Sequence, residues 1–500
     1  MLCAGLAAAQ SAPPPAPPRP LVVMLEAAPS TLDPIRAADA YGVRIAHQLL
    51  FETLLRIDDD LRIAPGVATA WSRPGPRRVR LTIRRGSRFQ QGEPLDAEDV
   101  VYTLESLLDP ASGSPHGAAL REKVAAVRVR PPDGVEIELT APYASILADL
   151  IVPVRSRRSK APHNGSGPFK LAAQSPTEIV LERNGGYHGA RPGVDRVVFK
   201  VVQDENTRLL KFMKGDVDLA VNAVPLDQLR QFRAPSLARR YEVVEAPGLS
   251  FAYLGFNVRD PILARREVRR ALAHAINVDA LVKHRQKGHS TRAAGVMPPG
   301  GPFAARTAPP AYDPALARRL LDEAGLPERG GPRFALTYKT SSDRSAIIQA
   351  RVIQADLRKV GVAVEVRSYE WATFYEDIQK GNFQLFSLRW IGVADPDFQY
   401  ELFHSTRTPP QGRNRGYFSH PEADRLLEAG RLELDAEKRR VLYRRLEELL
   451  AQELPYVNLW HNNNVAIVSR RYTGFRLHPS GGFQHLAGMR PVEPIAGGGR

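Results

Sequence analysis

The chain reads VVFKVVQDENTRLLKFMKGDVDLAV at residues 197–221 and VAVEVRSYEWATFYEDIQKGNFQLFSL at residues 362–388. Each stretch has the pattern of a strand, a helix, a Lys-Gly-Asp or Lys-Gly-Asn corner, and a second, apolar strand. Glycine at the corner supplies the left-handed conformation that ends a helix. The sequence therefore predicts two α/β lobes of similar construction, with chance resemblance between two β-α-β units as the alternative.

Capping residues and periodicity predict further elements of a mixed α/β chain. Helices are predicted after Asp313-Pro314 with Gly325 as terminator, after Asp96 with Asp99 completing a capping box, from Ser341-Ser342 to Lys359, and from Asp435 to Glu453. Strands are predicted at 79–83, 135–139, 196–202, 251–256, 334–338, 362–366 and 383–388. Facing strand ends of two such lobes would form a cleft, which is where ligands usually bind.

Composition is that of an ordinary globular protein, with 43% hydrophobic and 25% charged residues over 500 positions. That length predicts about three domains. The net charge is +15, but the basic residues are mostly arginines scattered along the chain, with only short clusters such as RSRRSK at 155–160. Nucleic-acid binders concentrate such residues on one face, so we expect no nucleic acid; attraction to anionic surfaces or ligands is the milder expectation.

The start, MLCAGLAAAQSAPPPAPPRP, has an apolar run with an A-x-A-like exit and then a Pro-rich tether. This pattern predicts the remnant of a secretory signal, and hence a periplasmic or extracytoplasmic protein; a linker fragment is the alternative. Cys3, the only cysteine, leaves a lipid anchor open. No later apolar run is long enough to predict a membrane span.

The stretch RWIGVADPDF at 389–398 has the residue types of a chemical site. Asp395 and Asp397 could act as a carboxylate pair, bind a metal together with His404 or His461, or only turn the chain. The sequence has no G-x-S-x-G elbow, no H-E-x-x-H, no P-loop and no phosphate-binding G-x-G-x-x-G. We therefore expect no catalytic residue, metal or cofactor, and keep a hydrolase only as a remote alternative.

A series of motifs resembles the extracellular solute-binding proteins of ABC importers, of the dipeptide, oligopeptide and nickel type. The motifs occur in that family's order from about residue 20 to 470. They are LRIAPGVATAW at 61–71, the segment 79–105 with GSRFQQGEPLDAEDV, GSGPFKL at 165–171, KGDVDLA at 214–220, LGFNVRD at 254–260, VRRALAHAINVDALV at 268–282, Glu370-Trp371 and Arg389-Trp390. Each motif is weak alone, and their ordered occurrence carries the resemblance.

The resemblance implies an α/β, two-lobed periplasmic-binding-protein fold (type II-like) with an extra α/β domain inserted near the N-terminus. Residues 1–19 would be the signal remnant and tether. Lobe I would comprise 20–47, 166–257 and 471–500, the inserted domain 48–165, and lobe II 258–470. The crossings between lobes would lie near GSGPF and LGFN. The implied protein is a monomer that closes on a solute and docks on an ABC permease of the inner membrane.

Ligand-binding residues are implied in the interlobe cleft, where closure must replace the water lost by the ligand. The expected set is Tyr41, Tyr253, Asn257, Trp371, Arg389, Trp390, Gly392 and Asp395. Trp371 and Trp390 would be the main walls, with Arg389 and Asp395 as polar contacts and Pro396-Asp397 as a turn.

In peptide-binding members, an aspartate three residues after the second tryptophan pairs with the ligand's α-ammonium. Val393 occupies that place here, and a neutral side chain cannot form this charge-assisted pair. A peptide is the default ligand, bound mostly through main-chain hydrogen bonds. The alternative is a non-peptide solute that is anionic, sugar-like or a metal chelate.

Overall fold

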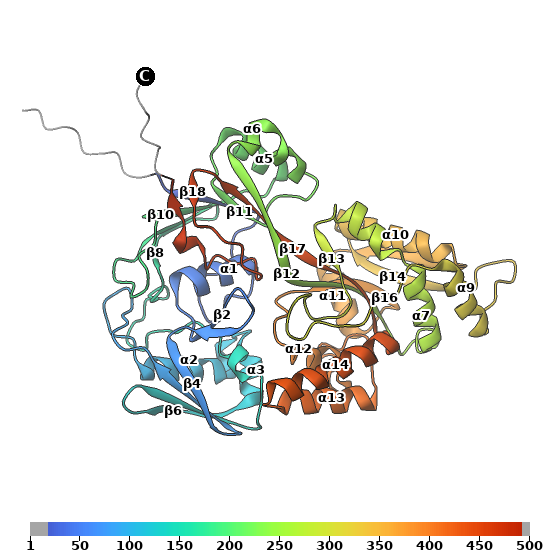
Figure 1. The fold of residues 1–500 in the computed structure, drawn as a ribbon, viewed down its shortest axis with the longest axis horizontal. Coiled ribbons are helices and arrows are strands. Elements are labelled where there is room, and N and C mark those ends of the chain that lie inside the picture. Colours follow the sequence, from blue (N-terminus) through green and yellow to red (C-terminus); the bar gives the residue numbers. More distant parts are fainter. Residues whose placement is uncertain (1–18, 493–500) are drawn as a thin grey trace, which may run out of the picture.

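A computed structural model describes residues 19–492, and one large sheet runs through both lobes (Figure 1). Its strand order is β15-β14-β16-β12-β17-β11-β1-β10-β9-β8, and β13 (Ser290–Arg292) pairs with β17. β8 (Phe169–Gln174) and β9 (Glu178–Arg183) form one edge, and β14 (Phe334–Ser341) and β15 (Val362–Tyr369) the other. The two-lobed α/β fold is thus confirmed.

The two similar stretches form units of the same topology. In the first, β10 (Arg196–Val201), α5 (Glu205–Lys214) and β11 (Leu219–Val221) skip over β1 (Leu21–Leu25), which pairs in parallel with both strands. In the second, β15, α11 (Trp371–Lys380) and β16 (Leu385–Trp390) skip over β14 in the same way. Gly215 and Gly381 end the two helices at φ +85° and +73°, as predicted.

Two long antiparallel strands connect the lobes: β12 (Tyr241–Phe256) and β17 (Tyr456–Ser469). Val244 of β12 packs in the core of lobe I, whereas Phe251 and Tyr253 pack in the core of lobe II. A register shift between Pro247 and Ser250 marks the change. The crossing therefore lies within β12, not at LGFN as expected, because a continuous strand ladder carries the chain from one core into the other.

The segment between α1 (Ala40–Ile45) and β8 has a sheet of its own, with the order β4-β5-β7-β6. These strands are β4 (Ala68–Gly75), β5 (Arg78–Ile83), β6 (Val124–Arg130) and β7 (Gly134–Leu139). Helix α2 (Ala97–Leu108) starts with the predicted capping box of Asp96 and Asp99, and its apolar face joins the core between sheet and helix. Helix α3 (Gly117–Lys123) follows and faces lobe II.

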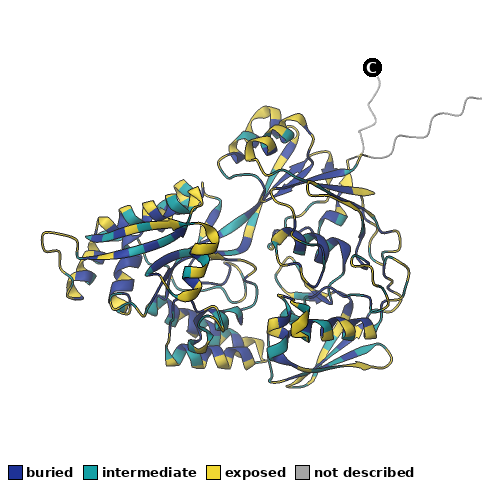
Figure 2. Ribbon diagram, turned by 180° about the vertical axis from the view of Figure 1, so that it is seen from behind, coloured by how far each residue is buried: buried dark blue, intermediate teal, exposed yellow. Residues whose placement is uncertain are grey.

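Helices cover lobe II with buried inner and exposed outer faces (Figure 2). They are α7 (Arg266–Ala275), α9 (Pro314–Glu323), α10 (Arg344–Arg358), α11, α12 (Phe398–Phe403), α13 (Pro421–Leu432) and α14 (Ala436–Glu453). The starts of α9 and α14 at Asp313 and Asp435 are confirmed. The predicted start at Ser341-Ser342 is wrong, because Ser341 extends β14 and Asp343 caps α10 through Ala346 N–H.

Candidate functional site

A small polar cluster lies where strand ends of the two lobes approach each other. Glu26 follows β1, Tyr41 and Arg44 come from α1, and Arg389 is near the end of β16. Burial raises the pKa of Tyr41 to about 12, and the exposed carboxylate of Glu26 acts in the same direction. The Arg44 guanidinium lies 5.6 Å from the centre of the Tyr41 ring. Lobe I thus contributes a carboxylate, a guanidinium and an aromatic ring to this cluster.

Arg389 is the contribution of lobe II to this cluster. Its side chain is exposed, yet surrounding protein lowers its pKa, with Glu26 of lobe I opposing that shift. Exposure together with partial desolvation is expected for a side chain that projects into the space between two lobes. Among residues 19–492 the Arg389 guanidinium has no ion pair or hydrogen bond. It is therefore available to an anionic group.

Trp371 starts α11 at the same edge of the sheet and is 54% exposed. Its indole stacks on the Tyr375 ring, with centroids 5.7 Å apart and planes at 16°. The Arg415 guanidinium donates to the Tyr375 hydroxyl at 3.0 Å and lies 4.4 Å from the Trp390 ring centre. A continuous stack of rings and one guanidinium thus runs from an exposed tryptophan to a buried one.

Three other predicted ligand-binding residues, Trp390, Tyr253 and Asn257, are buried and contact other parts of the protein. Trp390 is only 6% exposed and stacks on Tyr253, which is fully buried and also stacks on Tyr456 at 4.2 Å. Asn257 donates to the carbonyls of Gly381 and Phe383, which fixes the corner after α11. These side chains support the site from behind and do not line it, because strand pairing turns them into the core.

The loop after β16 touches the crossing strand. Gly392 is exposed at φ +76°, with open space where a Cβ would stand, and Ile391 is exposed beside it. Val393 is buried in the lobe II core, and its N–H donates to the Leu249 carbonyl of β12 at 3.1 Å. An acid in place of Val393 would therefore be buried here and would not meet a ligand.

Asp395 and Asp397 are committed to structural contacts. Asp395 forms a bidentate pair with Arg439 of α14 at 2.7 and 3.1 Å, and accepts from Asp397 N–H at 2.9 Å. This corrects the expectation that Asp395 contacts a ligand. Asp397 is more than a turn residue, because its buried carboxylate accepts from Lys123 Nζ and Ser145 Oγ, both at 2.8 Å.

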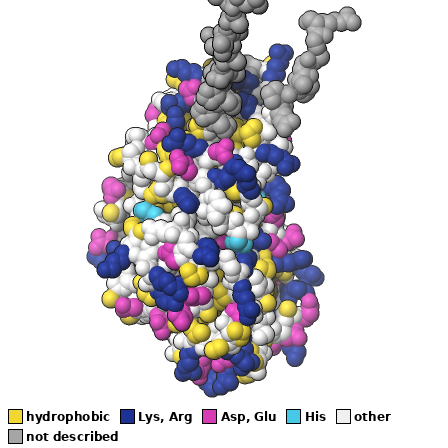
Figure 3. Space-filling model, turned by 90° about the vertical axis from the view of Figure 1, so that its left-hand side faces the viewer, with side chains coloured by type: hydrophobic (Ala, Val, Ile, Leu, Met, Phe, Trp, Pro, Cys, Tyr) yellow, Lys and Arg dark blue, Asp and Glu magenta, His cyan; other side chains and the backbone are white. Residues whose placement is uncertain are grey.

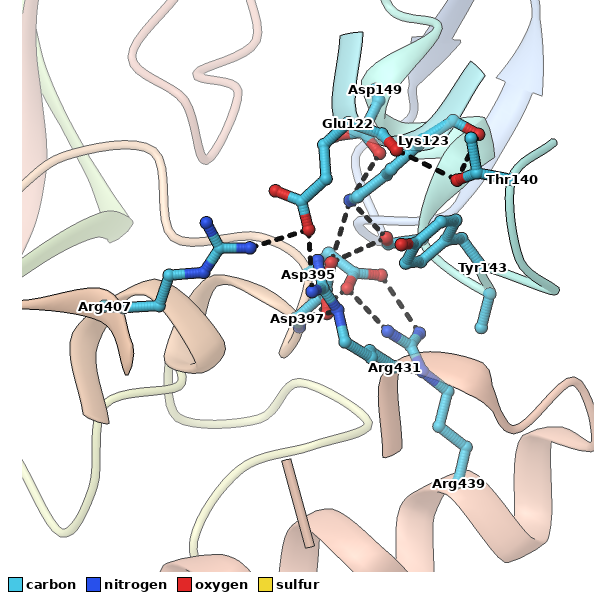
Figure 4. A network of polar contacts seen from close by, with 12 residues as sticks. Glu122, Lys123, Thr140, Tyr143, Asp149, Asp395, Asp397, Arg407, Arg431 and Arg439 are labelled. Atoms are coloured by element: carbon cyan, nitrogen blue, oxygen red, sulfur yellow. Dashed lines mark hydrogen bonds and ion pairs between the residues drawn. The ribbon is translucent and has the colours of Figure 1, made fainter. Parts of the chain in front are cut away.

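Asp397 is the centre of an interlobe network between the inserted segment and lobe II (Figure 4). Its members are Glu122, Lys123, Ser145, Asp149, Asp397, Arg407 and Arg431. Arg431 Nε donates to Asp397 at 3.1 Å, while its Nη1 reaches Glu122 at 3.0 Å. Buried pairs of this kind are costly to break, so the network holds the two parts together.

The charges of this network shift the pKa values of its members. Burial raises the pKa of Asp397, but Lys123 and Arg431 outweigh burial and lower it to about 2. Burial raises the pKa of Asp149 to about 6 although Lys123 acts against it. The pKa of Lys123 is raised, because Asp397 and Asp149 overcome the effect of burial. Asp397 thus stays ionised to a lower pH than Asp149 does.

Sequence reasoning missed Glu26, Arg415 and Lys123. Glu26 could have been found as the first charged residue after an apolar parallel strand, since ligand groups gather at that edge. Lys123 and Arg415 carry no such signal, because their partners are distant in the chain. The residues that the structure brings near one another from the two lobes are Glu26, Arg44 and Arg389, with Trp371 and Gly392 at the adjoining strand ends. Tyr41 is only 7% exposed and packs in the lobe I core.

Within residues 19–492, no group of three or more His, Cys, Asp or Glu side chains is placed to hold a metal ion. The same residues contain no helix that is both long and apolar enough to cross a membrane. A guanidinium, a carboxylate and ring faces can bind a small charged solute without performing chemistry on it.

Curated proteins of similar sequence cover most of the chain. It is 29% identical to Protein XP55 of Streptomyces lividans over 506 residues, covering 96% of this chain and 90% of that protein. It is 28% identical to the dipeptide-binding protein of Escherichia coli (strain K12) over 458 residues, covering 84% of each. Their lengths therefore match this chain closely.

Among solved structures, NikA from Brucella suis in complex with Fe(III)-EDTA has a TM-score of 0.84 at 23% identity. The match covers 95% of this chain and all of that one, so the whole architecture is shared. The family model of bacterial extracellular solute-binding proteins, family 5, matches residues 62–410. With most of its length in that match and the two-lobed fold in place, this chain belongs to the family 5 bacterial extracellular solute-binding proteins.

Proposed function

We propose that the protein captures a peptide between its lobes and delivers it to an ABC permease of the inner membrane. The observation that carries the proposal is that Glu26 of lobe I lies within electrostatic range of Arg389 of lobe II, an acidic and a basic residue from opposite lobes, with the exposed Trp371 on the lobe II side. A peptide with free ends carries one ammonium and one carboxylate, which these two groups complement. The relative described as a dipeptide-binding protein supports the same class of ligand.

In this proposal Arg389 binds the carboxylate end of the ligand, with Arg44 nearby. Glu26 takes the place of the acid that the sequence lacks at Val393. The exposed indole of Trp371 covers the apolar surface of the ligand, and the open space beside Gly392 lets the ligand approach the backbone. An anionic solute without an amine is the second candidate, favoured by two arginines facing one acid.

The lobes would close about the crossing strands β12 and β17. Lobe I contains the cores around β1 and β10, and lobe II those around β14 and α14. The interlobe network at Asp397 is formed in this structure and lies on the side away from the crossing (Figure 1). The protein acts outside the cytoplasm as a monomer, without a catalytic step and without nucleic acid.

Native mass spectrometry of protein purified without refolding tests the capture directly. We expect a 1:1 complex whose released component has the mass of a short peptide. Release of a sugar, a metal chelate or another anion instead would show that the ligand is the second candidate, a non-peptide solute. Turnover of peptides or glycosides above background by the purified protein would overturn the binding-protein account.

A further inference from the structure

Four arginines surround one hollow at the far end of lobe I, away from the crossing. Arg239 and Arg240 precede β12, and Arg470 and Arg471 follow β17, so the paired ends Tyr241 and Ser469 bring them together. The hollow has a volume of about 290 Å³ and is lined by these six residues. The four residues Arg239, Arg240, Arg470 and Arg471 are called the arginine hollow below.

The positive charge of the arginine hollow is only partly neutralised. Arg471 pairs with the buried Asp218 at 2.6 Å, and Arg470 approaches Glu242 at 4.0 Å. The Arg239 side chain has no hydrogen bond or ion pair within residues 19–492. Four like charges with only two counter-charges leave a net positive charge, which attracts an anionic partner. The hollow takes no part in the proposed capture of solute, because it lies at the opposite ends of the crossing strands.

Apolar side chains stand beside this charge. Leu210 and Met213, one turn apart on α5, are 54% and 52% exposed, and Lys211 and Lys214 flank them. Arg240 donates to the Met213 carbonyl at 2.8 Å, which places the C-terminal end of α5, with Met213 on it, next to the hollow. A free anion uses only the charges, whereas an anionic membrane accepts both the charges and the apolar side chains.

Arg19, the first described residue, lies at the same place. Arg19 donates to the Gly215 carbonyl at 3.0 Å, and so does Arg471 of the hollow. The eighteen residues before Arg19 contain no acidic side chain. Figure 3 shows Lys and Arg side chains over much of this face of the molecule, among acidic and apolar ones. We propose that the arginine hollow and the Leu210–Met213 face of α5 form a docking surface for an anionic lipid bilayer.

Vesicle co-sedimentation of the full chain tests this surface. The probe is phosphatidylglycerol:phosphatidylcholine vesicles at low salt, with pure phosphatidylcholine vesicles as background. Arg239→Ala/Arg470→Ala removes two charges without exposing the buried Asp218. Each basic residue near an anionic surface contributes about fivefold, so partition onto the mixed vesicles should weaken about 25-fold.

Arg128→Ala/Arg130→Ala is the matched control, with the same change of charge on β6 at the opposite end of the molecule (Figure 1). It should bind as the unaltered chain does. Equal weakening in both variants, or binding independent of phosphatidylglycerol, would overturn the proposal. So would stabilisation of the unaltered chain alone by inorganic phosphate without vesicle binding, since the hollow would then be a site for a free anion.

Discussion

Lys123 and Asp397 lie 274 positions apart in the sequence, yet the Lys123 ammonium donates to the Asp397 carboxylate at 2.8 Å, with both side chains buried. The lysine ends α3 of the inserted segment and the aspartate precedes α12 of lobe II. This contact joins the inserted segment to lobe II, whereas the two crossing strands join lobe I to lobe II. Lobe II is thus held to the rest of the molecule both by the crossing strands and by an ionic contact.

Replacing Asp397 by Asn should lower the free energy of unfolding by about 3 kcal/mol. The reason is that Lys123 and Arg431 would then be buried with less compensating charge. Urea unfolding at neutral pH measures the change. Glu437→Gln, which alters an exposed pair with Arg440, is the control and should leave stability within error. Equal stability of D397N and the unaltered chain would show that the network does not hold the parts together.

Glu447 of α14 should make the protein less stable as the pH rises from about 4.5 to 7. Burial raises the pKa of this carboxyl to about 7, so the folded state binds its proton where the unfolded state has lost it. The unfolded state ionises this carboxyl over that interval while the folded state keeps it protonated, so the free energy of unfolding falls by about 3 kcal/mol.

The measurement is urea unfolding at several pH values for the unaltered chain and for Glu447→Gln. The difference between the two isolates this group from Asp149, whose raised pKa acts in the same direction. The free energy of unfolding of the variant should rise relative to that of the unaltered chain as the pH rises. Parallel stability curves would contradict the assignment.

Trp371 should report ligand binding by fluorescence, because it is the exposed end of the aromatic stack at the site. Adding ligand to the unaltered chain should change the intrinsic emission, and Trp371→Phe should lose that change. Trp71→Phe, in the inserted segment, serves as the control and should keep it. A signal that survives in W371F would place the ligand elsewhere.

Glu26→Gln should weaken binding of peptides with a free amine by about 10- to 100-fold, the value of a hydrogen bond between charged groups. N-acetylated peptides, which lack the ammonium, should bind both proteins equally. Calorimetry with the two peptide series gives the comparison. Equal losses in both series would mean that Glu26 shapes the site and does not meet the ammonium.

Local rules predicted much of the fold. The Gly215 and Gly381 corners, the capping box at Asp96 and the helix starts at Asp313 and Asp435 depend on neighbours in sequence, so the sequence alone predicts them. The crossing within β12 depends on its pairing with a strand more than two hundred residues away. No local pattern marks such a position.

The site was harder to predict for the same reason. Arg389 and Trp371 were predicted and lie exposed at the strand ends, while Tyr253, Asn257 and Trp390 are buried, since alternate strand residues face opposite sides and the sequence does not say which side is the core. Asp397 was noticed as part of a turn. Its partner Lys123 comes from another domain, and only the folded chain shows the pair.

Calorimetric titration of short peptides into the unaltered chain and Arg389→Gln tests the central claim most directly. We predict 1:1 binding of peptides with a free carboxyl end, weakened about 10- to 100-fold by amidation of that end or by the substitution, and not weakened further by both together. Arg367→Gln, an exposed arginine paired with Glu365 on β15, should bind like the unaltered chain. An affinity that neither amidation nor R389Q changes would contradict capture of a peptide between the lobes. So would the absence of binding of any peptide.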